Sequence, residues 1–147
     1  MFKIINPKTK TQIEEYYKLR WLTLRKDWNQ EIGSEKDIYD KDSIHRMVID
    51  KNGLVLAVGR LHYNSIIESQ IRFMGVHPSY RRINLGTIIL QELEKISKET
   101  NHYKIILQAR ESAVKFYSSN GYVLEKKTHL LFDNIQHFLM SKRMVAI

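Results

Sequence analysis

The sequence predicts one α/β (α+β) domain, with a mixed, mostly antiparallel, twisted sheet of six to seven strands flanked by about four helices. The chain has 147 residues, 43% hydrophobic and 27% charged, which is typical of a soluble globular protein with a buried core. Hydrophobic patterns follow the order helix, helix, three strands, helix, strand, helix, two strands. A strand–helix–strand unit needs a parallel crossover, whereas hairpins are antiparallel. We therefore expect residues 1–147 to form a single domain around a mixed sheet.

Two helices are predicted in the N-terminal part of the chain, before the strands of the sheet. Apolar and aromatic side chains recur at near-helical spacing over residues 9–27. A shorter helix is predicted to begin at Ser34, which can act as its N-cap, with Asp37 in the capping position three residues later. Both helices are expected to flank the sheet.

The first three strands and the helix after them form the centre of the predicted fold. Residues 44–49 and 54–63 are expected to pair around the turn Lys51-Asn52-Gly53, and residues 66–76 form the third strand. Residues 84–99 predict a strongly amphipathic helix. Its buried face is expected to carry Leu85, Ile88, Ile89, Leu93 and Ile96.

The C-terminal part adds three strands and a short helix. Residues 104–109 predict a short apolar strand, and residues 113–119 a short helix ended by Asn120-Gly121. Residues 122–132 and 136–143 are expected to be the last two strands. Repeats and low-complexity tracts are absent from the sequence, so we expect no domain boundary.

Composition and charge narrow the class of protein. The formal net charge of +8 suggests an anionic partner, although no run of five basic residues occurs. With no cysteine the chain has no disulfide and no thiolate chemistry, and we expect no bound metal. The sequence shows neither a signal peptide nor an apolar stretch of the roughly 18–20 residues that span a bilayer. A cytoplasmic protein without a membrane partner is expected.

Residues 71–90 are the most informative segment. An apolar strand runs into a turn that contains Arg81 and Arg82, and an apolar helix follows. Backbone N–H groups, the positive end of the helix dipole and arginine side chains then meet at one place, which favours binding of an anion such as phosphate. An ordinary strand-to-helix connection with solvated arginines is the alternative.

Within this segment Val76, Pro78, Arg81 and Gly86 form the pattern V-x-P-x-x-R-x-x-x-x-G. The pattern resembles the coenzyme A pyrophosphate-binding motif of GNAT-type N-acyltransferases. Asn84 stands where that family usually has its first glycine, and asparagine is the non-glycine residue that best tolerates positive φ. By resemblance, the cofactor is acetyl-CoA, and it is bound by Met74, Gly75, Val76, Arg81, Arg82, Asn84, Leu85, Gly86, Thr87, Arg110, Ala113 and Tyr117.

A second segment, residues 110–122, resembles the family signature N-x-x-A-x-x-L-Y-x-x-x-G-F/Y. Ala113, Tyr117 and Gly121 fall in register, whereas Arg110 occupies the usual asparagine position. The resemblance implies that Tyr117 lies near the thioester sulfur and, as a phenol with a pKa near 10, protonates the leaving thiolate. A core tyrosine is the alternative. Both motifs together cover about a third of the chain.

Two neighbouring strands are expected to place polar side chains on one face of the sheet. Pairing His62 with Glu68 and Arg60 with Gln70 would gather five of them: Arg60, His62, Glu68, Gln70 and Arg72. Ile67, Ile71 and Phe73 then occupy the other face, and a slip of one residue would bury polar groups among them at a high cost. The alternative is a merely solvated face.

An attacking amine must be neutral, so a base or a water relay is needed. Glu68 is the first candidate and His62 the second. His129 and His137 are weaker candidates, because a lone histidine in a strand is more often structural. The resemblance implies that a backbone N–H at Gly75 or Val76, where the strand bulges, binds the oxyanion, and Gly75 fits such a bulge.

Residues 21–42 combine aromatic, basic and acidic side chains. In GNAT-like folds this region walls the acceptor pocket, and its acids and aromatics are expected to attract and stack on a cationic amine. Solvated helix residues are the alternative. Together with two strand arginines, the residues expected to bind the acceptor are Trp21, Arg25, Trp28, Arg60 and Arg72.

The leading hypothesis is therefore an N-acetyltransferase that transfers the acetyl group of acetyl-CoA to a primary amine of a small molecule, peptide or protein, by direct attack in a ternary complex. A non-catalytic acyl-CoA-binding regulatory module is the second hypothesis. A nucleic-acid-binding domain is the third, and the interspersed acidic residues argue against it. A monomer or homodimer is expected.

Overall fold

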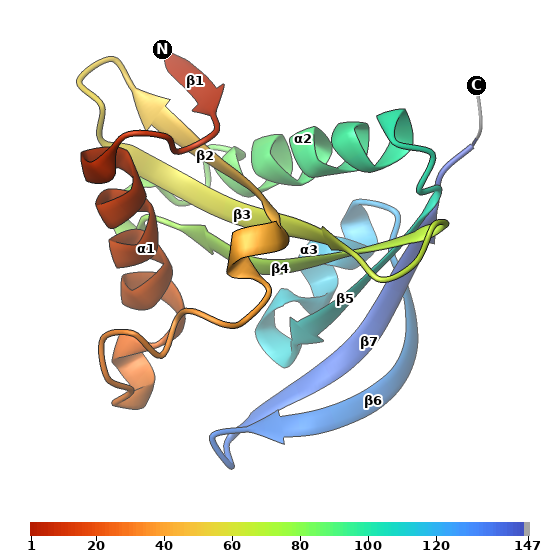
Figure 1. The fold of residues 1–147 in the computed structure, drawn as a ribbon. Coiled ribbons are helices and arrows are strands. Elements are labelled where there is room, and N and C mark those ends of the chain that lie inside the picture. The colour runs from red at the N-terminus through yellow and green to blue at the C-terminus, as the bar shows by residue number, and fades with distance from the viewer. Residues whose placement is uncertain (146–147) are drawn as a thin grey trace.

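The computed structural model describes residues 1–145, which form one seven-stranded sheet, three α-helices and four 3₁₀ helices (Figure 1). The α-helices are α1 (Lys10–Leu24), α2 (Leu85–Glu99) and α3 (Val114–Ser119). The strands are β1 (Phe2–Ile5), β2 (Ile44–Asp50), β3 (Val55–Tyr63), β4 (Glu68–Val76), β5 (Lys104–Arg110), β6 (Val123–Leu131) and β7 (Ile135–Arg143). The 3₁₀ helices are η1 (Lys26–Trp28), η2 (Asp40–Asp42), η3 (Pro78–Tyr80) and η4 (Glu111–Ala113). The predicted architecture is confirmed, with slightly fewer α-helices than expected.

The strand order is β1-β2-β3-β4-β5-β7-β6. Only the β4–β5 pair is parallel, with α2 as its crossover, so the sheet is mixed and mostly antiparallel as predicted. The edge strand β1, which pairs with β2, was not predicted. The described part contains no helix of the length and apolarity that crossing a membrane requires.

The prediction of a helix that begins at Ser34 is wrong. Turns occupy this stretch, and η2 follows at Asp40–Asp42. Polar side chains satisfy the backbone locally, because Glu35 accepts a hydrogen bond from the Gly33 amide at 2.7 Å and Asp40 accepts one from the Asp37 amide at 2.8 Å. Such side-chain to backbone bonds compete with helix formation.

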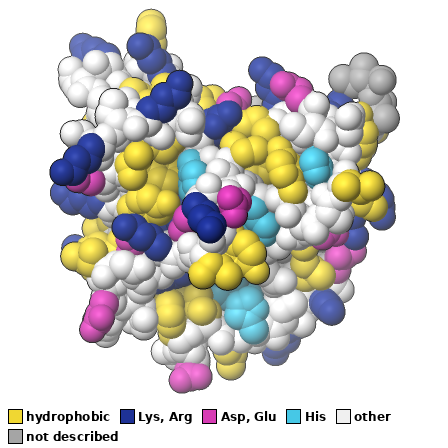
Figure 2. Space-filling view, viewed as in Figure 1, with side chains coloured by type: hydrophobic (Ala, Val, Ile, Leu, Met, Phe, Trp, Pro, Cys, Tyr) yellow, Lys and Arg dark blue, Asp and Glu magenta, His cyan; other side chains and the backbone are white. Residues whose placement is uncertain are grey.

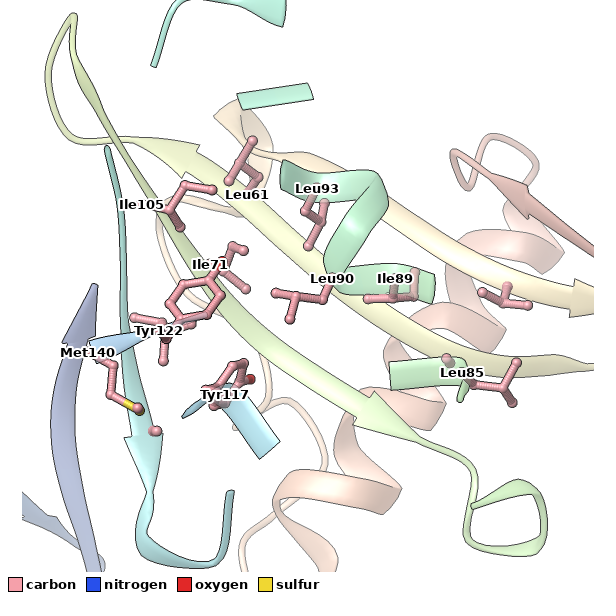
Figure 3. Close-up of a cluster of buried hydrophobic side chains, with 14 of the residues drawn as sticks. Leu61, Ile71, Leu85, Ile89, Leu90, Leu93, Ile105, Tyr117, Tyr122 and Met140 are labelled. Atoms are coloured by element: carbon pink, nitrogen blue, oxygen red, sulfur yellow. The ribbon is translucent and has the colours of Figure 1, made fainter. Parts of the chain in front are cut away.

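The sheet separates two cores. Helix α1 covers one face, where it packs on Met47, Val55 and Val58. Helices α2 and α3 cover the other face, and the larger core lies there. Figure 3 shows Leu85, Ile89, Leu90 and Leu93 of α2 beside Leu61, Ile71 and Ile105 of the strands, with Tyr117 of α3 close to Tyr122 and Met140. The two sheet faces are called the α1 face and the α2 face below.

The β3–β4 register confirms the predicted polar face but not the predicted partners. Arg60 pairs with Arg72 and His62 with Gln70, two residues away from the expected pairing. A shift of two residues keeps every side chain on its face. The five polar residues therefore lie on the α1 face as expected.

A bulge interrupts β4 at Phe73 and Met74, which together lie opposite Gly59. Phe73 has φ of 57°, and its ring lies against arginines of the α1 face, so placing Phe73 on the opposite face was wrong. The bulge predicted at Gly75 or Val76 is likewise misplaced, because Gly75 pairs regularly with Val58. A glycine is required there because a Cβ atom would collide with Thr23 of α1.

Strands β4 and β5 pair along only four residues each. Glu68 to Ile71 lie beside Lys104 to Leu107, and beyond Ile71 the two strands separate. The bulge at Phe73 increases the twist of β4 at this point. The result is an opening in the sheet between the C-terminal parts of β4 and β5.

Candidate active site

A cavity of about 350 Å³ occupies the opening between β4 and β5. Side chains of the α2 face contribute Ile71, Met74, Leu107, Ala109, Ala113 and Tyr117 to its wall. The α1 face and the β6–β7 hairpin contribute Leu24, Arg25, Gln70, Arg72, Phe73, Gln108, Arg110, His129, Leu131, Ile135 and His137. The cavity therefore has one apolar side and one polar, basic side.

The turn before α2 has the backbone of an anion-binding loop. Arg82 and Asn84 both adopt left-handed backbone conformations, with φ of 69° and 65°. The expectation that Asn84 tolerates positive φ is confirmed. Asn84 is also the N-cap of α2, yet its side chain makes no capping hydrogen bond, and the first turn contains no acidic residue. The N-terminus of α2 is thus available to an anion, beside the exposed Arg81 and Arg82.

Gly86 has a packing role within the same segment. A Cβ atom there would lie 3.2 Å from Phe116 Cζ and 3.8 Å from Val76 Cγ2. The absent side chain lets the first turn of α2 approach α3 and the end of β4. Leu85, by contrast, is buried in the α2-face core, so it supports the turn, and Thr87 is partly buried.

Tyr117 lines the apolar side of the cavity next to Ala113. Its ring packs edge-on against Phe116 and Tyr122, with centroids 5.0 and 5.7 Å away. Burial raises the pKa of Tyr117 to about 12, and the positive charge of Arg110 opposes the rise. The phenol is therefore a weaker acid than the unperturbed group, and it remains protonated at neutral pH.

His129 and His137 lie on the polar side of the cavity, stacked with ring centroids 4.6 Å apart. Burial lowers the pKa of His137, and the hydrogen bond to the Ile135 carbonyl partly offsets this. That bond, at 3.0 Å, uses Nδ1. Because a carbonyl only accepts, Nδ1 carries the proton, and Nε2 of neutral His137 has a free lone pair.

Glu68 and His62 do not line this cavity. Glu68 lies at the start of β4, where it accepts a hydrogen bond from Asn64 at 3.0 Å and forms an ion pair with Lys104 at 3.6 Å. Nδ1 of His62 faces Arg60 Nη2 at 3.2 Å. Because arginine only donates, His62 accepts with its one lone pair. Burial and the neighbouring Arg60 lower the pKa of His62.

Arg60 belongs to a buried ion-pair network on the α1 face. Its Nη1 lies 2.5 Å from Asp37 and 3.0 Å from Asp40. Arg20, a fully buried residue that the sequence reasoning did not single out, bonds Asp40 at 2.8 Å and the hydroxyl of Tyr16 at 2.9 Å. Burial opposes ionisation of Asp40, but its hydrogen bonds from Arg20, the Asp37 amide and Arg60 hold its pKa below the usual value.

Trp21 and Trp28 hold the loop after α1 and lie outside the cavity wall. The Trp21 indole donates to the Gln30 carbonyl at 3.0 Å, and Trp28 lies in η1. Arg25, at the end of α1, does reach the cavity, as does Arg72 of β4. Of the five residues expected to bind the acceptor, the structure brings these two arginines together.

Figure 2 shows the face seen in Figure 1, where basic and acidic side chains are interspersed and form no single basic stripe. Within the described residues, no group of three or more His, Cys, Asp or Glu side chains is arranged to hold a metal ion.

Comparison with known proteins bears directly on this site. The family model of the acetyltransferase (GNAT) family matches residues 13–122. An uncharacterized N-acetyltransferase of Bacillus subtilis, YjcF, is 28% identical over 140 residues, which cover 95% of this chain and 99% of YjcF.

Solved structures share the fold over nearly the whole length. An acyl-CoA N-acyltransferase from Pseudomonas aeruginosa superposes with a TM-score of 0.81 at 19% identity, covering 97% of this chain and 98% of that one. A GNAT family acetyltransferase from Elizabethkingia anophelis with acetyl-CoA bound has a TM-score of 0.78 at 13% identity, covering 97% and 98%. With the matched family model, these findings show that this chain is a member of the GNAT family of acetyltransferases.

Proposed function

We propose that this protein is a cytoplasmic N-acetyltransferase that transfers the acetyl group of acetyl-CoA to a primary amine by direct attack in a ternary complex. The observation that carries the proposal is the cavity at the β4–β5 opening, which is lined by residues of both faces of the sheet. A donor bound on the α2 face and an acceptor bound on the α1 face can meet there. The chain has no cysteine that could form an acyl-enzyme.

The residues present fit acetyl-CoA. The left-handed turn with Arg81, Arg82 and Asn84 offers N–H groups and positive charge to the pyrophosphate. Beyond Ile71 the edge of β4 is unpaired on its β5 side, so the backbone of Met74 can bond the amides of the pantetheine arm. The relative from Elizabethkingia anophelis binds acetyl-CoA on the same fold. Acetyl-CoA supplies the acetyl group as a thioester.

Two cavity residues are suited to the proton transfers. His137 Nε2 can accept the proton of the attacking amine, because the bond from Nδ1 to Ile135 fixes the tautomer. Tyr117, on the opposite wall, holds the proton that the leaving thiolate needs. We assign the base to His137 in preference to Glu68 and His62, whose acceptor atoms are engaged outside the cavity.

The test combines thermal shift with thiol detection, and uses two charge reversals near opposite ends of α2. Arg82→Glu should weaken acetyl-CoA binding about 10-fold or more, because a charge-assisted contact is replaced by repulsion. Lys98→Glu, which makes the same charge change in the last turn of α2, should bind acetyl-CoA like the unmodified protein.

Thiol release in an amine panel then separates the hypotheses. An acetyltransferase releases CoA only when an acceptor is present, whereas a regulatory module binds acetyl-CoA and releases none with any amine. Normal acetyl-CoA binding by Arg82→Glu would show that the donor site lies elsewhere.

A further inference from the structure

We infer that the acceptor is a small amine that also carries a carboxylate, and that Arg25 and Arg72 bind this carboxylate on the α1 face of the cavity. The inference rests on the proposed function, and it names the substrate class of that same site. This inference differs from the expectation that the acidic residues of segment 21–42 attract a cationic amine.

The first support is the charge of the cavity wall. Its polar side has three arginines (Arg25, Arg72 and Arg110) and two histidines, and no aspartate or glutamate among the described residues lines it. A polyamine entering this space would meet three positive charges and no carboxylate on the wall itself. A carboxylate would be attracted by all three guanidinium groups.

The second support is that these arginines have donors to spare. Within residues 1–145, Arg110 makes no side-chain hydrogen bond or ion pair, and Arg25 uses only Nε and Nη1, on the carbonyls of Ser34 and Leu24. Arg72 reaches Asp37 only at 3.5 Å. Burial first, and then their neighbours' positive charges, lower the pKa values of Arg25 and Arg72, so an anion between them would relieve repulsion.

The third support is that Asp37 and Asp40 of the loop are already paired with buried arginines. Asp37 and Asp40 accept hydrogen bonds from the buried Arg60 and Arg20 at 2.5 to 3.0 Å. Glu35 is buried and bonds the Gly33 amide. None of them lines the cavity, so they are not placed to attract a cationic acceptor there.

The geometry also positions the two ends of such an acceptor. The centroid of the Phe73 ring lies 5.6 Å from the Arg25 guanidinium carbon and 4.7 Å from that of Arg72, so one aromatic ring contacts both cations. His137 is the cross-strand partner of Arg110 on the same face. A carboxylate held by the arginines would leave the amine of a small molecule within the reach of His137. The cavity volume of about 350 Å³ favours a molecule of amino-acid size.

The test compares leucine with 3-methylbutylamine, which lacks only the carboxylate, and with spermidine. CoA release by the unmodified protein should give kcat/KM at least about 10-fold higher for the carboxylate-bearing amine. Arg25→Gln and Arg72→Gln should each lower kcat/KM for that amine about 10- to 100-fold, with the loss mainly in KM, and lower kcat/KM for 3-methylbutylamine by a much smaller factor.

Arg46→Gln is the matched control, because Arg46 pairs with Glu92 away from the cavity and its loss should change neither rate. Arg72 is 41% exposed and Arg25 is buried, so the Arg72 variant is expected to fold even where the Arg25 variant does not, and acetyl-CoA thermal shift checks both. Equal or better rates with 3-methylbutylamine or spermidine would overturn the inference and leave the proposed function intact. CoA release with no amine at all would instead count against the proposed function.

Discussion

At the scale of single residues, surroundings decide what His137 and Tyr117 can do. The Ile135 carbonyl fixes the His137 tautomer, and burial keeps the ring neutral near pH 7. Burial also raises the pKa of Tyr117 to about 12, so the phenol stays protonated and uncharged throughout the neutral pH range. In the proposed mechanism His137 accepts a proton and Tyr117 supplies one, as acyl transfer to an amine requires.

His137→Gln should lower kcat/KM about 10²–10⁴-fold, the usual effect of losing one proton-transfer group. The proposed base acts as the neutral imidazole and its pKa is lowered, so activity of the unmodified protein should persist below pH 6.5 and fall only at still lower pH. Thiol release measured from pH 5 to 9 at saturating acetyl-CoA checks both points. His102→Gln, outside the cavity, is the control, and a full rate with Gln at position 137 would exclude the residue as base.

At the scale of elements, the contact between α1 and β4 depends on Gly75. The side chain of Thr23 in α1 occupies the space that a Cβ atom on residue 75 would need. This close approach sets how near α1, and with it Arg25, comes to the cavity. The strand pattern of the sequence cannot show such a contact, because it depends on how two distant segments meet.

Gly75→Ala should lower the free energy of unfolding by about 1–3 kcal/mol, because the new methyl group overpacks against Thr23. Combining it with Thr23→Ala removes the colliding oxygen and should restore part of the loss. Urea unfolding of both single variants and the double variant gives the coupling energy. Strict additivity of the two changes would mean that the contact is not the cause.

Local pattern was enough for some elements and not for others. Helix α2 and the polar face of β3 and β4 follow from hydrophobic periodicity, which acts over a few residues. The helix predicted at Ser34 failed because Glu35 and Asp40 satisfy backbone groups locally. The motif resemblance singled out Tyr117 as a site residue and the turn at Asn84 as an anion-binding turn. The bulge that turns Phe73 toward the arginines could not be predicted, because it depends on pairing between strands across the sheet.

At the scale of the whole molecule, several histidines are held neutral by folding. Burial is the main cause of the lowered pKa values of His45, His62 and His137. The His45 ring is also hydrogen-bonded at both nitrogens, to the Tyr16 hydroxyl and to the Asp40 carbonyl. In the unfolded chain each would titrate near 6.5.

The free energy of unfolding should therefore decrease as pH falls below about 6.5. In that range the unfolded chain binds more protons than the folded one, so stability rises with pH and levels off above 6.5. Urea denaturation at pH 7.5, 6.5 and 5.5 measures the slope. His45→Gln should flatten it while His102→Gln leaves it unchanged, and a stability that is constant across this range would contradict the prediction.

The separation of the two cores by the sheet has a consequence for how this enzyme can diverge. Leu85 at the start of α2 and Tyr117 of α3 belong to the core of the α2 face, whereas Arg25 and the loop after α1 lie on the α1 face, outside that core. Exchanges in that loop, and at hairpin positions of β6 and β7 other than the buried Met140, need not disturb the packing of that core. Redesign for a new acceptor can therefore begin with these two segments, with α2 and α3 left as they are.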